Sequence, residues 1–437
     1  MKKYLSLLAL VFTISCEQQE KSLVDIENQT NGSNEKTNLQ SFSKNTPNSK
    51  FAKLKAKVSN AKAQNPSGIK IFSSDVKLLP VSTDFKYEIN QWHLRNTNTY
   101  EAWKYSQGNK DLIVAVIDSG VDYNHPDLKN NTLKGTSFPN NDLNAIPESR
   151  QEHGTHVAGI IAGNGNIKGI APNVKILPIK ASTDGSFNNS DLEKSLKYAM
   201  DNKASIINMS LGSSSLLSYA GYKSYNRLID EAIGMGINVV VSAGNDGYSS
   251  TNDKYTGKIK VIATDRQNRI SSFTNINENG DPRVVSAPGV DIYSTVLTEN
   301  CPDEAEKNCK KAYAFESGTS MAAPLVAGEL ALIKSAMYDD YLRFVVDSKY
   351  FGEAYKPYSY YEFFHSKQKE AAEDLDISIT PSKMAEVLLF HSTNKNNRRT
   401  PAAIVYEADR DDVFGYGKVD VGLAVKLASK VFTSTLN

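Results

Sequence analysis

The chain alternates short apolar runs, rich in β-branched residues, with longer stretches of helical periodicity. This alternation constrains its fold more than any other feature. The apolar runs are too short for helices and are predicted to be buried parallel strands, at 112–117, 174–179, 205–209, 237–241 and 259–263. Helical patterns at 190–201 and 222–234 lie between them, and Ser190 and Glu193 have the spacing of a capping box. The sequence therefore predicts an α/β fold with a mostly parallel central sheet and helices on both faces, in three layers.

The composition excludes several broad classes of protein. The 437 residues include 50 Lys and Arg against 49 Asp and Glu, a formal net charge of +1. A chain so balanced is not expected to bind nucleic acid through bulk charge. With 26 Gly, 15 Pro and 3 Cys, it is neither collagenous nor a small scaffold held by disulfides.

The first residues have the pattern of an export signal. Lys2 and Lys3 precede a nearly continuous apolar run at 4–15, which predicts a signal peptide over 1–15. The run ends at Cys16 in a segment that resembles the lipobox of bacterial lipoproteins, with Thr13 where leucine is usual. Lipidation of Cys16 predicts anchoring to a membrane of the cell envelope. The alternative is simple cleavage with Cys16 incidental, which predicts a periplasmic or extracellular protein.

Residues 16–86 are expected to lie outside the main fold. The stretch from Glu17 to about Gly68 is rich in Asn, Lys, Ser, Gln and Glu, and its only aromatic residues are Phe42 and Phe51. Such a segment cannot bury enough apolar surface to offset its ordering entropy. We interpret residues 16–86 as a polar tether or a reduced propeptide, and residues 87–437 as the folded domain.

Two polar residues follow predicted strands, where a parallel sheet forms its functional sites, and two more stand in distinctive short motifs. Asp118 follows the first predicted strand, and Asn245 follows another. His153 begins the segment His153-Gly-Thr-His, and Ser320 ends the segment Ser-Gly-Thr-Ser320. A serine hydroxyl is a weak nucleophile at neutral pH and needs a base to take its proton, which a histidine can do. An aspartate can hold that histidine in one tautomer and stabilise its cation.

These segments, in the order Asp, His, Ser, resemble those around the triad of the subtilisin-like serine proteases, or subtilases. The segments at 207–212, 286–290 and 415–420 also have counterparts in that family. The resemblance runs from about residue 87 to the C-terminus, apart from one insertion. It implies the three-layer subtilisin-like fold and a serine endopeptidase that acts through an acyl-enzyme on a protein or peptide substrate. No cofactor is expected for this chemistry, and the chain is expected to be a monomer.

The resemblance also assigns a role to each matching residue. Asp118, His153 and Ser320 form the triad, and Asn245 stabilises the oxyanion, with Thr319 supporting it. The residues expected to line the substrate are Ser210, Leu211, Gly212, Ala243 and Gly244.

Metal binding is not expected at the histidines. His153 and His156 could suggest a metal pair, but no third ligand is evident, and we expect His156 to be a packed residue that supports the site. Many relatives bind Ca²⁺ through an Asp at the position of Asp127 and a loop that corresponds here to 162–168. That loop is shorter in this chain, so the strong calcium site is expected to be missing, while a weak site elsewhere is left open.

The other two cysteines, Cys301 and Cys309, are close in sequence. An oxidising envelope compartment favours a disulfide between them. The alternative is a pair of free thiols.

The main departure from the family is an insertion at about 338–376. It is rich in Tyr and Phe, which favours a surface excursion with a small core of its own. The alternative is that these aromatic residues are exposed and form an exosite for a partner or substrate.

Two functional alternatives remain from the sequence. Within the peptidase reading, broad degradation competes with dedicated processing of one precursor. The second class of function is a non-catalytic homologue that binds peptides. The presence of all three triad residues argues against it.

Overall fold

The structure is a computed structural model that describes residues 90–211, 219–247, 257–276, 283–298, 312–349, 356–375, 377–393 and 416–433. The predicted signal peptide, the predicted tether up to residue 86 and Cys16 lie outside these ranges. So do Gly212, Cys301 and Cys309, so the predicted disulfide stays a prediction.

The centre of the described domain is a seven-stranded sheet in which all neighbouring strands are parallel. The order is β2-β3-β1-β4-β5-β6-β7. The strands are β1 (Ile113–Asp118), β2 (Thr136–Ser137), β3 (Lys175–Lys180), β4 (Ile206–Met209), β5 (Asn238–Ser242), β6 (Ile259–Thr264) and β7 (Val284–Pro288). All five predicted strands are present, with their ends shifted by no more than one residue. The predicted fold class is confirmed.

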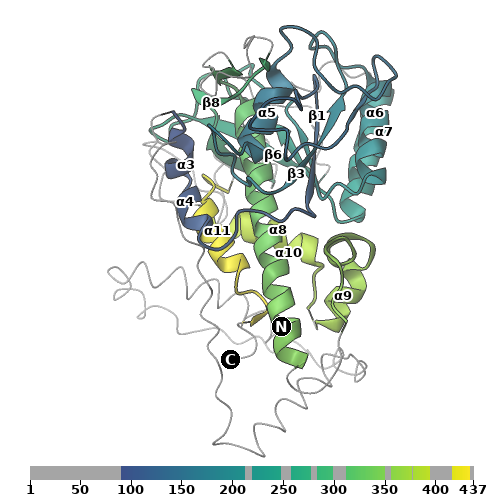
Figure 1. Cartoon of the computed structure of the whole chain (residues 1–437), viewed down its shortest axis with the longest axis vertical. Helices are drawn as coiled ribbons and strands as arrows, with labels where there is room; N and C mark the ends of the chain where they lie inside the picture. The colour runs from purple at the N-terminus through teal and green to yellow at the C-terminus, as the bar shows by residue number, and fades with distance from the viewer. Residues whose placement is uncertain are drawn as a thin grey trace, which may run out of the picture. The chain divides into compact units, whose positions relative to one another are not determined.

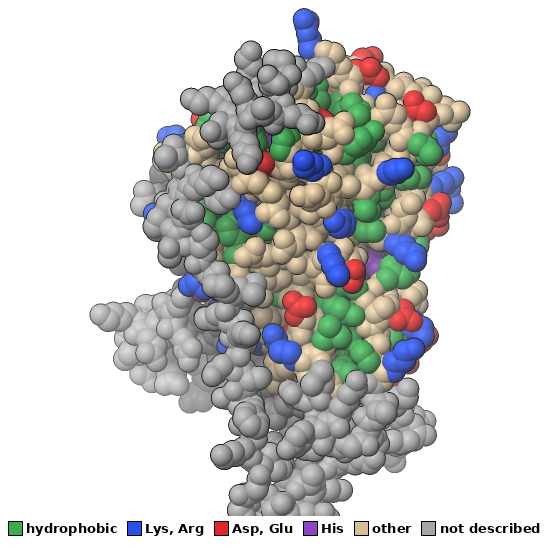
Figure 2. Space-filling model, in the orientation of Figure 1, with side chains coloured by type: hydrophobic (Ala, Val, Ile, Leu, Met, Phe, Trp, Pro, Cys, Tyr) green, Lys and Arg blue, Asp and Glu red, His purple; other side chains and the backbone are tan. Residues whose placement is uncertain are grey.

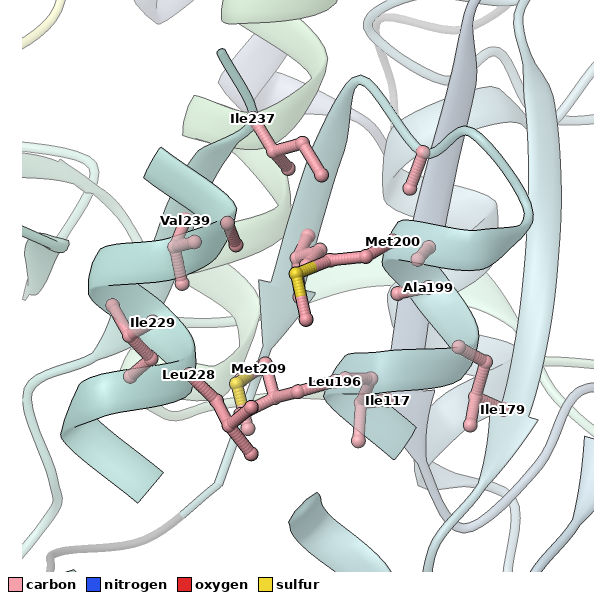
Figure 3. Packing of buried hydrophobic residues seen from close by; sticks show 14 of the residues in the cluster. Ile117, Ile179, Leu196, Ala199, Met200, Met209, Leu228, Ile229, Ile237 and Val239 are labelled. Atoms are coloured by element: carbon pink, nitrogen blue, oxygen red, sulfur yellow. The ribbon is translucent and has the colours of Figure 1, made fainter. Parts of the chain in front are cut away.

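Helices cover both faces of this sheet (Figure 1). One face is covered by α6 (Asn189–Asp201) and α7 (Tyr219–Gly234), and the other by α5 (His153–Ala162) and α8 (Thr319–Lys349). In Figure 3, Leu196 and Met200 of α6 and Ile229 of α7 point toward strand residues such as Ile117 and Val239. These side chains form one continuous apolar core between the sheet and the α6–α7 layer.

The remaining elements are short. They are α3 (Trp92–Asn96), α4 (Thr99–Ala102), the antiparallel pair β8 (Ile292–Thr295) and β9 (Tyr313–Glu316), the π-helical turn η5 (Glu362–Ser366), α9 (Gln368–Asp374), α10 (Pro381–His391) and α11 (Val421–Ala428). On the face shown in Figure 2, side chains of both charge signs are interspersed over these and the larger elements.

The predicted capping box at the start of α6 was wrong. The N-cap is Asn188, whose extended backbone lets its Oδ1 accept the N–H of Asp191 at 2.8 Å. Asn188 Nδ2 also donates to the Asp191 carboxylate. Ser190 already lies inside the helix, because an asparagine two residues earlier caps it equally well.

Helix α8 begins at Thr319, one residue before Ser320. It continues to Lys349 and so includes the first residues of the predicted insertion. In the described part of the chain, the segment Thr319–Val345 is long and apolar enough to cross a membrane, but its apolar window is entirely buried inside the protein. It is therefore the core helix of the domain.

The described aromatic residues of the insertion form a core rather than an exposed patch. Phe363 is fully buried and stacks on Tyr341 of α8, with ring centroids 4.3 Å apart. Phe364 and, from the C-terminal segment, Phe432 pack against Phe363, and Tyr360 packs against Phe364. These residues are buried, but they share their core with Phe432, so it is not a core of the insertion alone. Tyr350, Phe351 and Tyr355 lie outside the described ranges.

The insertion is also joined to the sheet by polar contacts. His365 Nε2 lies 2.9 Å from the hydroxyl of Ser205, just before β4. His365 Nδ1 lies 3.2 Å from the carbonyl oxygen of Met235, shortly before β5. Because β4 and β5 begin here, the insertion packs at the amino ends of the strands, away from their carboxyl ends.

Candidate active site

Asp118 and His153 form a hydrogen-bonded pair at the carboxyl end of β1. Asp118 is the last residue of the strand and is 1% exposed. His153 is the first residue of α5, and its Nδ1 donates to Asp118 Oδ1 at 2.9 Å. Asp118 Oδ1 also accepts the N–H of Ser119 at 2.7 Å. A carboxylate oxygen accepts this hydrogen bond, so in the neutral form of His153 the proton lies on Nδ1 and Nε2 has a free lone pair.

The start of α5 can approach β1 this closely because the residue after His153 is glycine. A Cβ on Gly154 would lie 2.2 Å from the carbonyl oxygen of Gly120 and 3.0 Å from Cβ of Asp118. The hydroxyl of Ser119 accepts the N–H of Gly154 at 3.1 Å and fixes the contact.

The protonation of His153 depends on two carboxylates. Burial alone would lower the pKa of its imidazole, but the charge and hydrogen bond of Asp118, with a further contribution from Glu316, raise it to about 9. The pair therefore favours the imidazolium that forms when His153 takes a proton.

Ser320 lies at the start of α8, nearly buried against the end of β4. Its Oγ donates to the carbonyl of Ser210 at 3.2 Å, and the Ser210 hydroxyl donates to the carbonyl of Ser320 at 2.8 Å. Among the described residues, no hydrogen bond joins Ser320 Oγ to His153. Two hydrogen bonds therefore hold Ser320 to Ser210, one of the residues expected to line the substrate.

The side-chain amide of Asn245 has a fixed orientation. Its Oδ1 accepts two hydrogen bonds from Thr319, one from the backbone N–H and one from the hydroxyl, both at 2.9 Å. The donor Nδ2 must therefore point the other way, and it lies 3.3 Å from where a Cβ on Gly318 would be. Asn245 is exposed, so this donor is open to a ligand beside Ser320.

The predicted substrate-lining residues are partly described. Gly244 has a φ of +103°, and its N–H donates to the Thr319 hydroxyl at 3.1 Å, while Ala243 is buried. The Leu211 carbonyl accepts the hydroxyl of Ser242 at 2.7 Å. Ser210, Leu211, Ala243 and Gly244 therefore lie at the ends of the neighbouring strands β4 and β5.

Sequence reasoning missed two residues of this site. Asn275 accepts the N–H of Asp246 through its Oδ1 at 2.9 Å and donates its own N–H to the Gly244 carbonyl. It thereby holds the loop that carries Asn245. Glu316, at the end of β9, interacts electrostatically with His153. In the sequence, the only sign of a role for Glu316 is its place four residues before Ser320. No sequence pattern indicates a role for Asn275.

His156 is the packed residue that the sequence predicted. It is fully buried, and its Nε2 donates to the carbonyl of Ala314 on β9 at 3.2 Å. In the described part of the chain, no group of three or more His, Cys, Asp or Glu residues could hold a metal ion.

The residues at the family's calcium position do not fit a calcium ion. Asp127 Oδ2 accepts the N–H of Ile167 at 2.8 Å, and the loop packs so closely that a Cβ on Gly165 would meet Asp127 Oδ1 at 2.0 Å. The ammonium of Lys168 donates to Asn164 Oδ1 at 3.0 Å. A loop amide and a lysine therefore occupy oxygens that a calcium ion would need.

The amino-acid sequence of the chain is similar to those of known proteins. The profile of the subtilase family (peptidase S8) matches residues 109–344. The major intracellular serine protease of Bacillus subtilis (strain 168) is 32% identical over 299 residues, which cover 64% of this chain and 87% of that protein. The chain belongs to the subtilase family. A thermophilic serine proteinase of Bacillus sp. (strain AK1) is 39% identical over 259 residues, or 58% of this subtilase and 59% of that protein.

A solved structure supports the fold of this subtilase. The crystal structure of a lanthipeptide protease matches it with a TM-score of 0.59 at 22% identity, covering 80% of this chain and 98% of that one. At this identity the match shows the common fold. The alignment with the thermophilic proteinase spans less than two thirds of that relative's length.

Proposed function

We propose that this subtilase is a serine endopeptidase that hydrolyses peptide bonds through an acyl-enzyme on Ser320. The observation that carries the proposal is the hydrogen bond from His153 Nδ1 to the buried Asp118, which leaves Nε2 as a base. The family membership supports the same reaction class.

In the proposed reaction, Ser320 Oγ attacks the carbonyl carbon of the scissile bond, and its proton passes to His153 Nε2. His153 then protonates the leaving nitrogen as the C–N bond breaks, which leaves an ester on Ser320. Water, deprotonated by His153, hydrolyses this ester and restores the hydroxyl. The Ser320 hydroxyl must first leave the Ser210 carbonyl, and catalytic hydrogen bonds often align only in the substrate complex.

The experiment that tests the proposal is digestion of an unfolded protein, such as reduced casein, by the purified full chain. New peptide termini are identified by mass spectrometry, with Ser320→Ala as the inert control. A peptide-binding homologue would bind casein fragments without cutting them. Many unrelated cleavage sites would indicate broad degradation, whereas very few would favour processing.

Asn245→Ala is expected to lower kcat by about 10²–10³-fold, the size of the loss for the equivalent asparagine of subtilisin. The reason is that Nδ2 of Asn245, held by Thr319, would donate to the oxyanion only as it forms. Steady-state kinetics on a peptide anilide checks this. Thr319→Val, which removes one of the two bonds to Oδ1, should cause a smaller loss. A decrease of less than about tenfold for Asn245→Ala would contradict the assigned role.

We further propose that neither catalysis nor stability requires calcium at the Asp127 loop. The contacts of Asp127 and Lys168 support this. Removing divalent ions with a chelator is expected to leave the melting temperature and kcat unchanged. A site occupied at 100 times its Kd would add about 2.7 kcal/mol to the free energy of unfolding. A melting temperature several degrees higher in added Ca²⁺, with the increase lost in Asp127→Asn, would therefore refute the proposal.

A further inference from the structure

The end of β9 places a carboxylate beside the histidines of α5. Ala314 and Glu316 lie on the same face of the strand, because side chains alternate along it. His156 of α5 donates to the Ala314 carbonyl, and Glu316 Oε2 lies 4.0 Å from His156 Nδ1. Glu316 comes four residues before Ser320 in the sequence.

The Glu316 carboxylate is open to a ligand. Its side chain is 24% exposed, and within the described ranges no hydrogen bond holds it. Most polar groups that lose water on folding find a partner. A partly exposed carboxylate that none of the described residues holds by a hydrogen bond, next to His153, can accept a hydrogen bond from a substrate.

The position of Glu316 assigns it to one side of the scissile bond. The acyl part of the substrate is expected along the ends of β4 and β5, where Ser210 and Gly244 lie. Glu316 belongs instead to the β8–β9 pair, which packs on α5 (Figure 1). His153, at the start of α5, gives its proton to the leaving nitrogen. Glu316 therefore faces the leaving-group side.

The charges around Glu316 favour a cationic ligand. The groups that act on it are His153 of α5, Glu152 just before that helix, and Asp118 of β1. His156 is the other titratable group beside it, and burial lowers the pKa of that imidazole to about 3, so it stays neutral. Burial, then repulsion from Glu152 and Asp118, raises the pKa of Glu316 to about 7 despite the opposing effect of His153. A bound ammonium or guanidinium group would relieve this repulsion.

We propose that Glu316 is a specificity-determining residue that binds the side chain of a lysine or arginine immediately after the scissile bond. This inference rests on the proposed endopeptidase function. It predicts a preference for substrates with a basic residue at that position and rejection of acidic ones.

The test uses quenched peptides that differ only in the residue after the cleaved bond: Lys, Gln or Glu. For the full wild-type chain, kcat/KM is expected to be about 3- to 10-fold higher for Lys than for Gln, as for a partly exposed charge pair. Glu316→Gln should bring this ratio to about one, and Glu316→Lys should favour the Glu peptide. Glu152→Gln is the matched control, because it removes a nearby charge without removing the contact, and it should keep the preference.

Two pH readouts separate this role from a structural one. The Lys-to-Gln ratio should rise between about pH 6 and pH 8 as Glu316 ionises. The acid limb of kcat/KM should move to lower pH in Glu316→Gln, because Glu316 contributes to the raised pKa of His153.

The two proposals fail in distinguishable ways. A wild-type ratio near one, or an unchanged ratio in Glu316→Gln, overturns the assignment of Glu316 if the chain still reacts with a fluorophosphonate at Ser320. Absence of that reaction in the wild type overturns the endopeptidase function and this inference with it.

Discussion

Replacing either His153 or Ser320 by alanine is expected to lower kcat by about 10⁶-fold, the loss that removal of either residue causes in subtilisin. The two side chains act as one unit: without His153 the Ser320 proton has no acceptor, and without Ser320 there is no nucleophile. Progress curves at high enzyme concentration, with a sensitive fluorogenic peptide, measure the residual rate.

The double variant provides the sharper form of this test. It should be no slower than either single variant, because each one already removes the whole covalent route. Asp118→Asn should keep the fold but lower kcat by about 10⁴-fold, since the amide would favour the wrong tautomer of His153. Losses that multiply in the double variant would mean that the two residues act independently, contrary to the proposed mechanism.

Phe363→Ala is expected to lower the free energy of unfolding by about 3–5 kcal/mol, the usual cost of removing a buried phenylalanine. Phe363 is fully buried and contacts Tyr341 of α8 and Phe432 near the C-terminus, so the cavity would open between three segments of the chain. Urea unfolding, followed by fluorescence, gives the change in midpoint and slope.

The control for this variant is another phenylalanine in a different environment. Phe315 is 50% exposed and packs on one side against Tyr293. Phe315→Ala should therefore cost only about 1 kcal/mol. At temperatures where it stays folded, the Phe363→Ala variant should cleave short peptides at the wild-type rate. The reason is that the insertion packs at the amino ends of the strands, whereas the candidate active site lies at their carboxyl ends. A loss of stability below about 1 kcal/mol would show that this cluster is not a structural core.

The strands were predictable because burial on both faces leaves a direct mark on the sequence. Runs such as 112–117 are apolar at every position, and their length is typical of a buried strand and short for a helix. The start of α6 was harder to predict, because Asn188 and Ser190 are both good caps, and in the structure Asn188 caps the helix through the N–H of Asp191. The two-residue strand β2 has too few residues to show any pattern.

The candidate site was predictable where its residues carry their own chemistry. Asp118, His153 and Asn245 are polar residues that follow or face the ends of apolar strands. The contacts that hold them were not predictable. Asn275 reaches Gly244 only through the fold, and Glu316 meets His156 only because β9 packs on α5. Such contacts join residues far apart in sequence and leave no local pattern.

The most direct test of the central claim is mass spectrometry of the purified full chain after reaction with a fluorophosphonate probe. Ser320 Oγ should displace fluoride from phosphorus while His153 takes the proton. The expected result is one adduct, on the peptide that contains Ser320, absent from His153→Ala. An unmodified Ser320 in a folded wild-type chain, or an adduct that persists without His153, would contradict the proposed triad.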